Sequence, residues 1–121
     1  MEKVNIESGF DSIDEFWDPR VAGKLNGQTV KFSKGRGEFV WHEHDDADEL
    51  FLVSSGVLRI QFRDQKDIVL KEGEFLVVPA GTEHCPVAEP EVDIVLFEPE
   101  NTLNTGNVEN DRTRSDLSKL D

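Results

Sequence analysis

The residues best suited to chemistry are three histidines and a glutamate, which fall in two stretches of the chain. His42 and His44 stand one residue apart, Glu49 follows five residues later, and His84 ends a second patterned stretch that begins at Gly73. Side chains alternate between the two faces of a strand, so His42 and His44 would point the same way from one strand. Three imidazoles and a carboxylate suit a divalent transition metal, and zinc, iron, manganese, nickel and copper all accept such ligands.

The first stretch is a weak signal when it is taken alone. A His-x-His pair often arises by accident or lies on a surface without binding anything. The second stretch strengthens it, because Pro79-Ala-Gly81 is a turn that can bring the strand of His84 to the same end of the sheet. The sequence therefore predicts one metal site with four ligands: His42, His44, Glu49 and His84.

The two stretches together resemble the two signature motifs of the cupin superfamily. The first motif is matched at His42, His44, Glu49 and Gly56, and the second at Gly73, Pro79, Gly81 and His84. Two positions depart from the pattern. The leading glycine of the first motif is displaced by one residue, to Gly37 or Gly35, and Ala88 replaces the asparagine that closes the second motif. The motifs cover residues 37–88, and the chain is similar to the small single-domain cupins of the mannose-6-phosphate isomerase-like group.

This resemblance implies a fold, a ligand set and two kinds of function. The fold would be all-β, a small antiparallel double-stranded β-helix, which is a jelly-roll-like barrel. The function would be that of a metal-dependent enzyme acting on a small oxygen-rich substrate, as a dioxygenase or as a sugar isomerase or epimerase. The alternative is a non-catalytic module in which the metal helps to hold a small ligand or sugar. The motifs name no substrate, because cupins carry many chemistries on one barrel.

Residues 28–98 have the pattern of an all-β domain even without the resemblance. In the segment from Val57 to Arg63, Leu58, Ile60 and Phe62 share one face and polar residues the other. Further strands are predicted at 29–33, 38–44, 49–53, 68–70, 75–78, 83–87 and 91–98, with turns at 34–37 and 54–56. No long helical period interrupts them, which argues against a parallel α/β sheet.

The two ends of the chain differ from this central part. Residues 10–17 predict a short helix capped by Asp11 or Ser12, with Phe10, Ile13 and Trp17 on the face that covers one end of the barrel. Residues 100–121 are polar and indicate a partly ordered tail, a short helix at 115–120, or a segment that packs across a partner subunit. The predicted organisation is 1–26 as helix and connection, 27–98 as barrel and 99–121 as C-terminal tail.

The composition limits the classes of binding partner and the cellular location that are expected. The 121 residues carry a formal net charge of −13, which favours solubility and disfavours binding to nucleic acid or to anionic membranes. One cysteine allows no internal disulfide, and no signal peptide or membrane span is recognised, so a cytoplasmic protein is expected.

Three neighbours of the predicted ligands need an interpretation. Trp41 alternates with His42 and should point outward, toward another subunit or the N-terminal helix; together with the resemblance, such a patch favours a homodimer. Cys85 should face away from the metal, and no base is left to activate it as a nucleophile. The acidic run at 45–48 is typical of a solvated loop.

Overall fold

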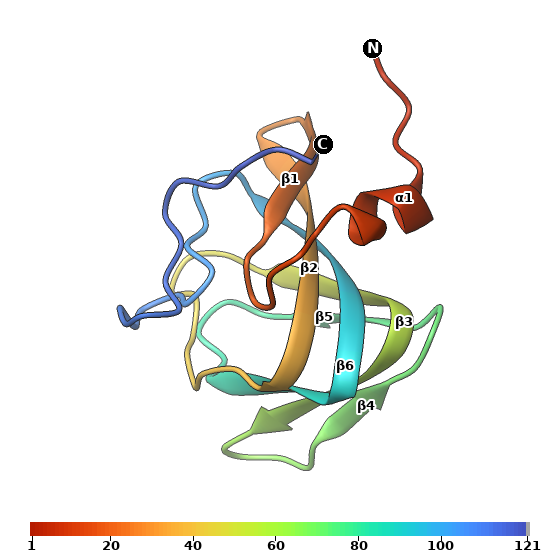
Figure 1. Ribbon diagram of the computed structural model, residues 1–121. Helices are drawn as coiled ribbons and strands as arrows, with labels where there is room; N and C mark the ends of the chain where they lie inside the picture. Colours follow the sequence, from red (N-terminus) through yellow and green to blue (C-terminus); the bar gives the residue numbers. More distant parts are fainter. Residues whose placement is uncertain (121) are drawn as a thin grey trace.

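The protein is described here over residues 1–120 by a computed structural model, which is mostly antiparallel β-sheet with one short helix (Figure 1). The elements are α1 (Ile6–Asp11), β1 (Arg20–Leu25), β2 (Gln28–Glu38), β3 (Glu49–Phe62), β4 (Ile68–Leu70), β5 (Phe75–Val78) and β6 (His84–Pro99). The strands hydrogen-bond in the order β1-β2-β6-β3-β4, and β5 pairs with β3. The sheet curls into a barrel, which confirms the predicted all-β fold.

Two strands are longer than the sequence predicts, because they bend where turns were expected. β2 runs through the predicted turn at 34–37, and β3 through the predicted turn at 54–56. The ladder between β3 and β6 shifts register between Val53 and Ser55 and again between Gly56 and Leu58. Such bulges bend a strand without ending its pairing, so the glycines mark corners of the barrel and not hairpin turns. The predicted breaks at 34–37 and 54–56 are therefore wrong.

The segment that carries the His-x-His pair, residues 39–48, is not the regular strand that was predicted. Its only bridge within the described residues joins His42 to His84, through amide-to-carbonyl hydrogen bonds of 2.9 Å in both directions. The next residue, Glu43, gives its amide to the Asn107 side chain and accepts a bond from the Asn107 amide. Asn107, which comes from the C-terminal segment, thus makes the hydrogen bonds to the Glu43 backbone that a neighbouring strand would otherwise make.

The N-terminal helix begins and ends earlier than expected. It spans Ile6–Asp11, and Asn5 caps it by accepting a hydrogen bond from the amide of Ser8 at 2.9 Å. Asp11 and Ser12 therefore lie at its end, and the prediction that they cap its start is wrong. The predicted apolar face is confirmed for Phe10 and Ile13, which are both buried. The Phe10 ring stacks on Phe32 with centroids 4.5 Å apart.

The segments expected as a connection and as a tail both pack on the sheet. β1 lies within the predicted connection and pairs with β2. The C-terminal segment, residues 100–120, returns to β1, where Val21 exchanges backbone hydrogen bonds with Ser118 and Leu120 at 2.9 and 3.0 Å. It contains no helix, so the predicted helix at 115–120 is wrong, and it lies against its own barrel. Asp121, the last residue of the predicted tail, lies outside the described residues.

Two apolar clusters stabilise this arrangement. The larger fills the barrel with side chains from β3 and β6, including Phe51, Leu58 and Ile94. The smaller lies on the outer face of the sheet, where α1 covers Phe32. Because Phe32 faces outward to the helix, its neighbours on β2 face inward, and the interior receives Lys31. No helix of residues 1–120 is long and apolar enough to cross a membrane.

Candidate metal centre

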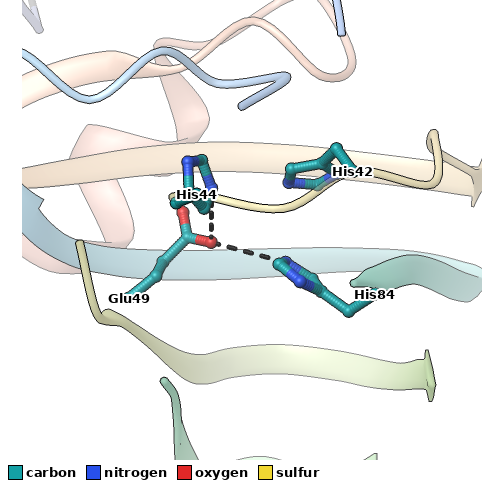
Figure 2. Close-up of side chains that lie close together, drawn as sticks. All are labelled: His42, His44, Glu49 and His84. Atoms are coloured by element: carbon teal, nitrogen blue, oxygen red, sulfur yellow. Dashed lines mark ion pairs between the residues drawn. The ribbon is translucent and has the colours of Figure 1, made fainter. Parts of the chain in front are cut away.

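All four predicted ligands converge at one end of the barrel interior (Figure 2). One ligand atom from each lies within 4.8 Å of the others, and we call this group the four-residue cluster: His42, His44, Glu49 and His84. Its members are buried, with exposed fractions between 0% and 7%. Glu49 opens β3, His84 opens β6, and the other two come from the 39–48 segment. The cluster thus joins two strand ends to one irregular segment.

The alternation that predicted a common direction for two of the imidazoles holds, although the strand does not. His42 and His44 are buried, whereas Trp41 and Glu43 between and beside them are half-buried. An extended backbone is sufficient for this alternation, and a complete ladder is not needed.

Two of the imidazoles are oriented by the same local device. Nδ1 of His42 lies 2.9 Å from the carbonyl oxygen of Val40, and Nδ1 of His84 lies 2.8 Å from that of Thr82. A carbonyl oxygen only accepts, so each Nδ1 carries the proton and donates it. Each Nε2 is left with its lone pair, which is the form that binds a metal.

The cluster leaves buried polar atoms facing one another without hydrogen bonds. Nε2 of His44 lies 3.2 Å and Nε2 of His84 lies 3.6 Å from Oε1 of Glu49, and none of the three atoms has a hydrogen-bond partner among the described residues. Unpaired buried polar atoms are costly, and three that face one point call for a common partner. A divalent cation would satisfy all three, so the donor set fits a metal.

The electrostatics of the cluster keep its donors in the form a metal requires. Burial alone would raise the pKa of Glu49, but Glu98, His44 and His84 outweigh burial and hold it well below its usual range. Burial, reinforced by the neighbouring His84, lowers the pKa of His42 to about 4. At neutral pH the glutamate is therefore ionised and His42 is neutral, as coordination demands.

The irregular half of the cluster is held in place by contacts from outside the sheet. Glu43 and Asn107 exchange two hydrogen bonds of 2.9 and 3.0 Å, and the amide of Gly81 donates to the carbonyl of His44 at 2.8 Å. Gly106 has a φ of +57° and lies so close that a methyl group on it would collide with the Glu43 carbonyl. The C-terminal segment therefore clamps the backbone between the two histidines.

A small cavity adjoins the cluster. It has a volume of about 30 Å³, enough for about one water molecule. His42 and Glu49 contribute to its wall, and the remainder is mostly apolar: Trp17, Pro19, Phe39, Phe51, Pro86, Ile94 and Leu96, with Ser33 and Asn104 as the other polar residues. None of the lining residues is a lysine or an arginine.

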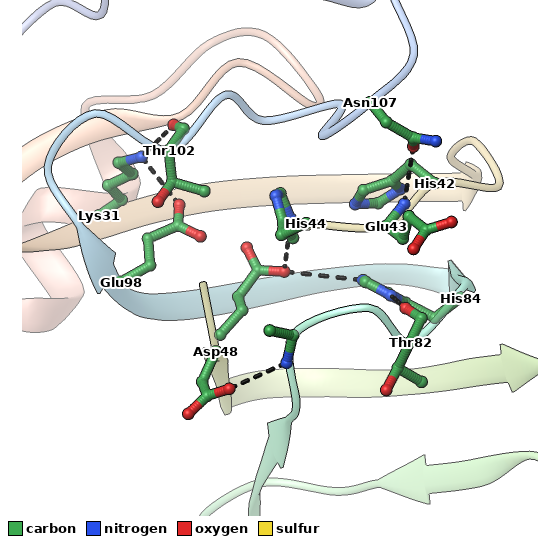
Figure 3. Close-up of polar contacts among 12 residues, drawn as sticks. Lys31, His42, Glu43, His44, Asp48, Thr82, His84, Glu98, Thr102 and Asn107 are labelled. Carbon is green, nitrogen blue, oxygen red and sulfur yellow. Dashed lines mark hydrogen bonds and ion pairs between the residues drawn. The ribbon is translucent and has the colours of Figure 1, made fainter. Parts of the chain in front are cut away.

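The neighbouring residues take the following places. Trp41 lies against Arg63 of its own chain, whose guanidinium carbon lies 3.7 Å from the ring centroid, whereas we expected another subunit or the N-terminal helix to cover it. Cys85 is fully buried, and burial together with Glu38 raises the pKa of its thiol to about 12, which makes it unreactive. Asp48 accepts a hydrogen bond from the amide of Ala80 at 2.9 Å, so one member of the acidic run fixes the turn before His84 (Figure 3).

Sequence reasoning missed two charged residues beside the cluster, Lys31 and Glu98. Both are 1% exposed. One signal was present: Glu98 continues the alternating series Val92, Ile94 and Leu96, all of which face the interior. A carboxylate in step with a buried apolar series is a candidate for a functional role.

Comparison with known proteins agrees with this geometry. The sequence model of the Cupin_2 family, described as a cupin domain, matches residues 28–99. Among solved structures, a cupin-2 domain containing protein from Shewanella frigidimarina is 45% identical, with a TM-score of 0.77, over 80% of this chain and 94% of that one. Protein NMB1881 from Neisseria meningitidis is 28% identical, with a TM-score of 0.75, over 82% of this chain and all of that one.

A curated relative matches over a shorter stretch. The uncharacterized protein YdbB of Bacillus subtilis is 43% identical over 61 residues, which are 50% of this chain. The match spans about half of that relative, 54% of its length. The family profile, the solved structures and the barrel lead to the same conclusion: the chain belongs to the cupin family.

Proposed function

We propose that the protein is a metal-dependent enzyme that binds one divalent transition metal at the four-residue cluster and acts on a small oxygen-bearing substrate. The observation that carries this proposal is the set of unpaired buried atoms, His44 Nε2, His84 Nε2 and Glu49 Oε1, facing one point. When bound, such a metal supplies Lewis-acid chemistry to an oxygen atom that coordinates it. Zinc, iron, manganese, nickel and copper all accept this donor set.

The cavity beside the cluster bears on which substrate class fits. The cavity has room only for an oxygen-bearing group bound beside the cluster, and its mostly apolar wall suits a ligand whose adjoining part is apolar. A sugar phosphate fits less well, because the lining offers no cationic side chain to pair with a phosphate. Of the two enzyme classes implied by the motifs, dioxygenase chemistry is therefore favoured over sugar isomerisation, and membership of the mannose-6-phosphate isomerase-like group stays a prediction.

One observation favours the non-catalytic alternative. Apart from His42 and Glu49, no residue that lines the cavity carries a titratable side chain, so no free general base faces a bound molecule. A module that holds a metal and a small ligand needs no such base. Catalysis that uses only the metal and an external oxidant needs none either, so a turnover assay decides between the two.

The test compares turnover with binding in the same protein. Wild type is loaded separately with Fe(II), Mn(II), Ni(II), Cu(II) and Zn(II), and metal content is measured after dialysis. Oxygen uptake is then followed with catechols and 1,2-diketones, and isomerisation with aldoses and sugar phosphates; His44→Ala is the control. Oxygen uptake that His44→Ala abolishes supports the enzyme. Saturable binding with no turnover of any substrate supports the module.

We also propose that the protein is a homodimer. β5 pairs only with β3 within residues 1–120, so it is an edge strand. Phe75 and Val77 on one of its faces are 62% and 47% exposed. Burial of that apolar edge against a second copy would remove it from water. Light scattering at micromolar concentration tests this, and a monomeric mass would contradict it.

A further inference from the structure

A buried ion pair lies behind the carboxylate of the four-residue cluster (Figure 3). Lys31 of β2 and Glu98 of β6 are each 1% exposed, and Nζ of the lysine lies 2.8 Å from Oε1 of the glutamate. The same Nζ donates to the carbonyl of Thr102 at 3.1 Å. Two charges taken out of water are costly even when paired, and apolar residues of similar size would often serve stability as well. The pair therefore calls for a role beyond stability.

The second oxygen of Glu98 points to that role. Oε2 has no hydrogen-bond partner among the described residues. The strand pairings place the two glutamates side by side, because Leu50 faces Phe97 in the ladder between β3 and β6. Glu98 thus lies between Lys31 and the four-residue cluster.

We propose that Lys31 and Glu98 are positioning residues for Glu49. A glutamate side chain rotates about three bonds, and a buried contact from behind removes that freedom. In the observed orientation Oε1 of Glu49 faces Nε2 of His44 and Nε2 of His84. This inference rests on the proposed metal at the cluster, and it adds the residues that hold the carboxylate ligand ready for it.

The lysine has a separate part in this arrangement. Two carboxylates side by side in a buried place repel each other. Lys31 supplies a compensating positive charge on the far side of Glu98, so the second carboxylate adds no net charge to the cluster. The two residues therefore act as one neutral unit, and removal of the lysine alone should do more harm than removal of both charges.

The first experiment compares two variants of the glutamate. Glu98→Gln keeps the shape and a hydrogen-bonding group beside Glu49, whereas Glu98→Leu keeps only the bulk. Co(II) affinity is measured by chelator competition, and the Co(II) absorption spectrum reports the ligand geometry. We expect Glu98→Gln to stay within about 3-fold of wild type and Glu98→Leu to bind about 10- to 100-fold more weakly, with a changed spectrum.

A matched control lies on the same two strands. Lys34 and Asp93 also pair across β2 and β6, at 3.3 Å, but on the outer face and about one quarter exposed. Asp93→Leu removes an ion pair between the same strands without touching the cluster. We expect its Co(II) affinity and spectrum to equal those of wild type, which separates positioning from a general loosening of the sheet.

The second experiment covers the case in which Glu98→Leu fails to fold. Lys31→Met leaves the buried Glu98 carboxylate without its positively charged partner. Adding Glu98→Gln to this variant removes the unpaired negative charge. We expect the single variant to bind Co(II) at least about 10-fold more weakly and the double variant to recover most of that loss, a coupling that independent sites do not show. If the single and the double variant both keep the Co(II) affinity and spectrum of wild type, the positioning role of Lys31 and Glu98 is overturned, and the proposed metal site is not. Wild type that binds no metal would overturn the proposed function as well.

Discussion

The four-residue cluster has two halves that are built in different ways. Glu49 and His84 are the first residues of β3 and β6, the strands that share one of the two longest ladders in the barrel. His42 and His44 lie in the 39–48 segment, which has a single bridge to the sheet within residues 1–120. The strand half is fixed by the fold itself. The other half depends on hydrogen bonds with Asn107 and with the turn before His84.

This difference indicates which half of the cluster can open while the barrel stays folded. Opening the strand half would break the β3–β6 ladder and with it the main core. Opening the segment half would break only the clamp on Glu43 and a few backbone bonds. Segments with few buried apolar contacts and few ladder bonds open at lower free energy than core strands. Metal entry and exit are therefore expected on the 39–48 side.

The largest effect on metal binding is expected when one ligand, from either half of the cluster, is removed. His44→Ala and His84→Ala should both weaken metal binding by at least about 100-fold, because losing a ligand costs more than losing an outer contact. Metal content after dialysis measures this, and circular dichroism checks that the barrel remains folded. If His44→Ala kept full stoichiometry while His84→Ala lost the metal, the segment half would not belong to the site.

The next effect concerns stability of the metal-free protein at acidic pH. The pKa of His42 is about 4 in the folded state, below its ordinary 6.5, so the unfolded chain binds a proton first as the pH falls. Stability is thus full above pH 6.5 and falls toward pH 4, with a loss from this group of about 2 kcal/mol by pH 5.

Urea unfolding in EDTA at pH 8 and at pH 5 measures that loss. His42→Gln is the matched variant, because it cannot take up the proton and should lose less stability between the two pH values. Equal losses in wild type and variant would show that the segment half does not hold His42 in a buried neutral form.

The smallest effect on metal binding is expected from a change in the clamp, which is the contact of Gly106 and Asn107 with the Glu43 backbone. Gly106→Ala places a methyl group against the Glu43 carbonyl at a φ of +57°, so the C-terminal segment must move away. Metal affinity should fall by about 10-fold, because the outer contact that orients two ligands is lost. Gly37→Ala is the control: its φ of +66° carries the same backbone strain, but nothing lies within 4 Å of the new methyl group. Equal losses in both variants would assign the effect to strain and not to the clamp.

The sequence was sufficient for the fold and for the members of the cluster, for a physical reason. Alternation gives the face of a side chain from local residues only, and it correctly grouped Leu58 and Ile60 on the inner face of β3. It also placed His42 and His44 on one side. These predictions needed no knowledge of which segments pair with which. That the cluster binds a metal stays a prediction.

The missed features all depend on contacts between distant residues. Alternation in β2 does not say which face is inside, and α1 covers Phe32 on the outer side, so Lys31 was not recognised as an interior residue. The bends in β2 and β3 looked like turns, because glycine marks both. The clamp joins Glu43 to Asn107 across 64 positions, and no local pattern of a polar tail reveals such a contact.

That clamp also sets an order for synthesis on the ribosome. Asn107 is made 64 positions after Glu43, and β6, which carries His84 and pairs with both β2 and β3, is made shortly before it. Until those residues emerge, the early strands lack their central partner and two histidines lack their neighbours. Chains rich in such distant pairings close late. The nascent chain therefore cannot complete the four-residue cluster together with its clamp before residue 107 is made, and a metal that binds this arrangement would bind after that point.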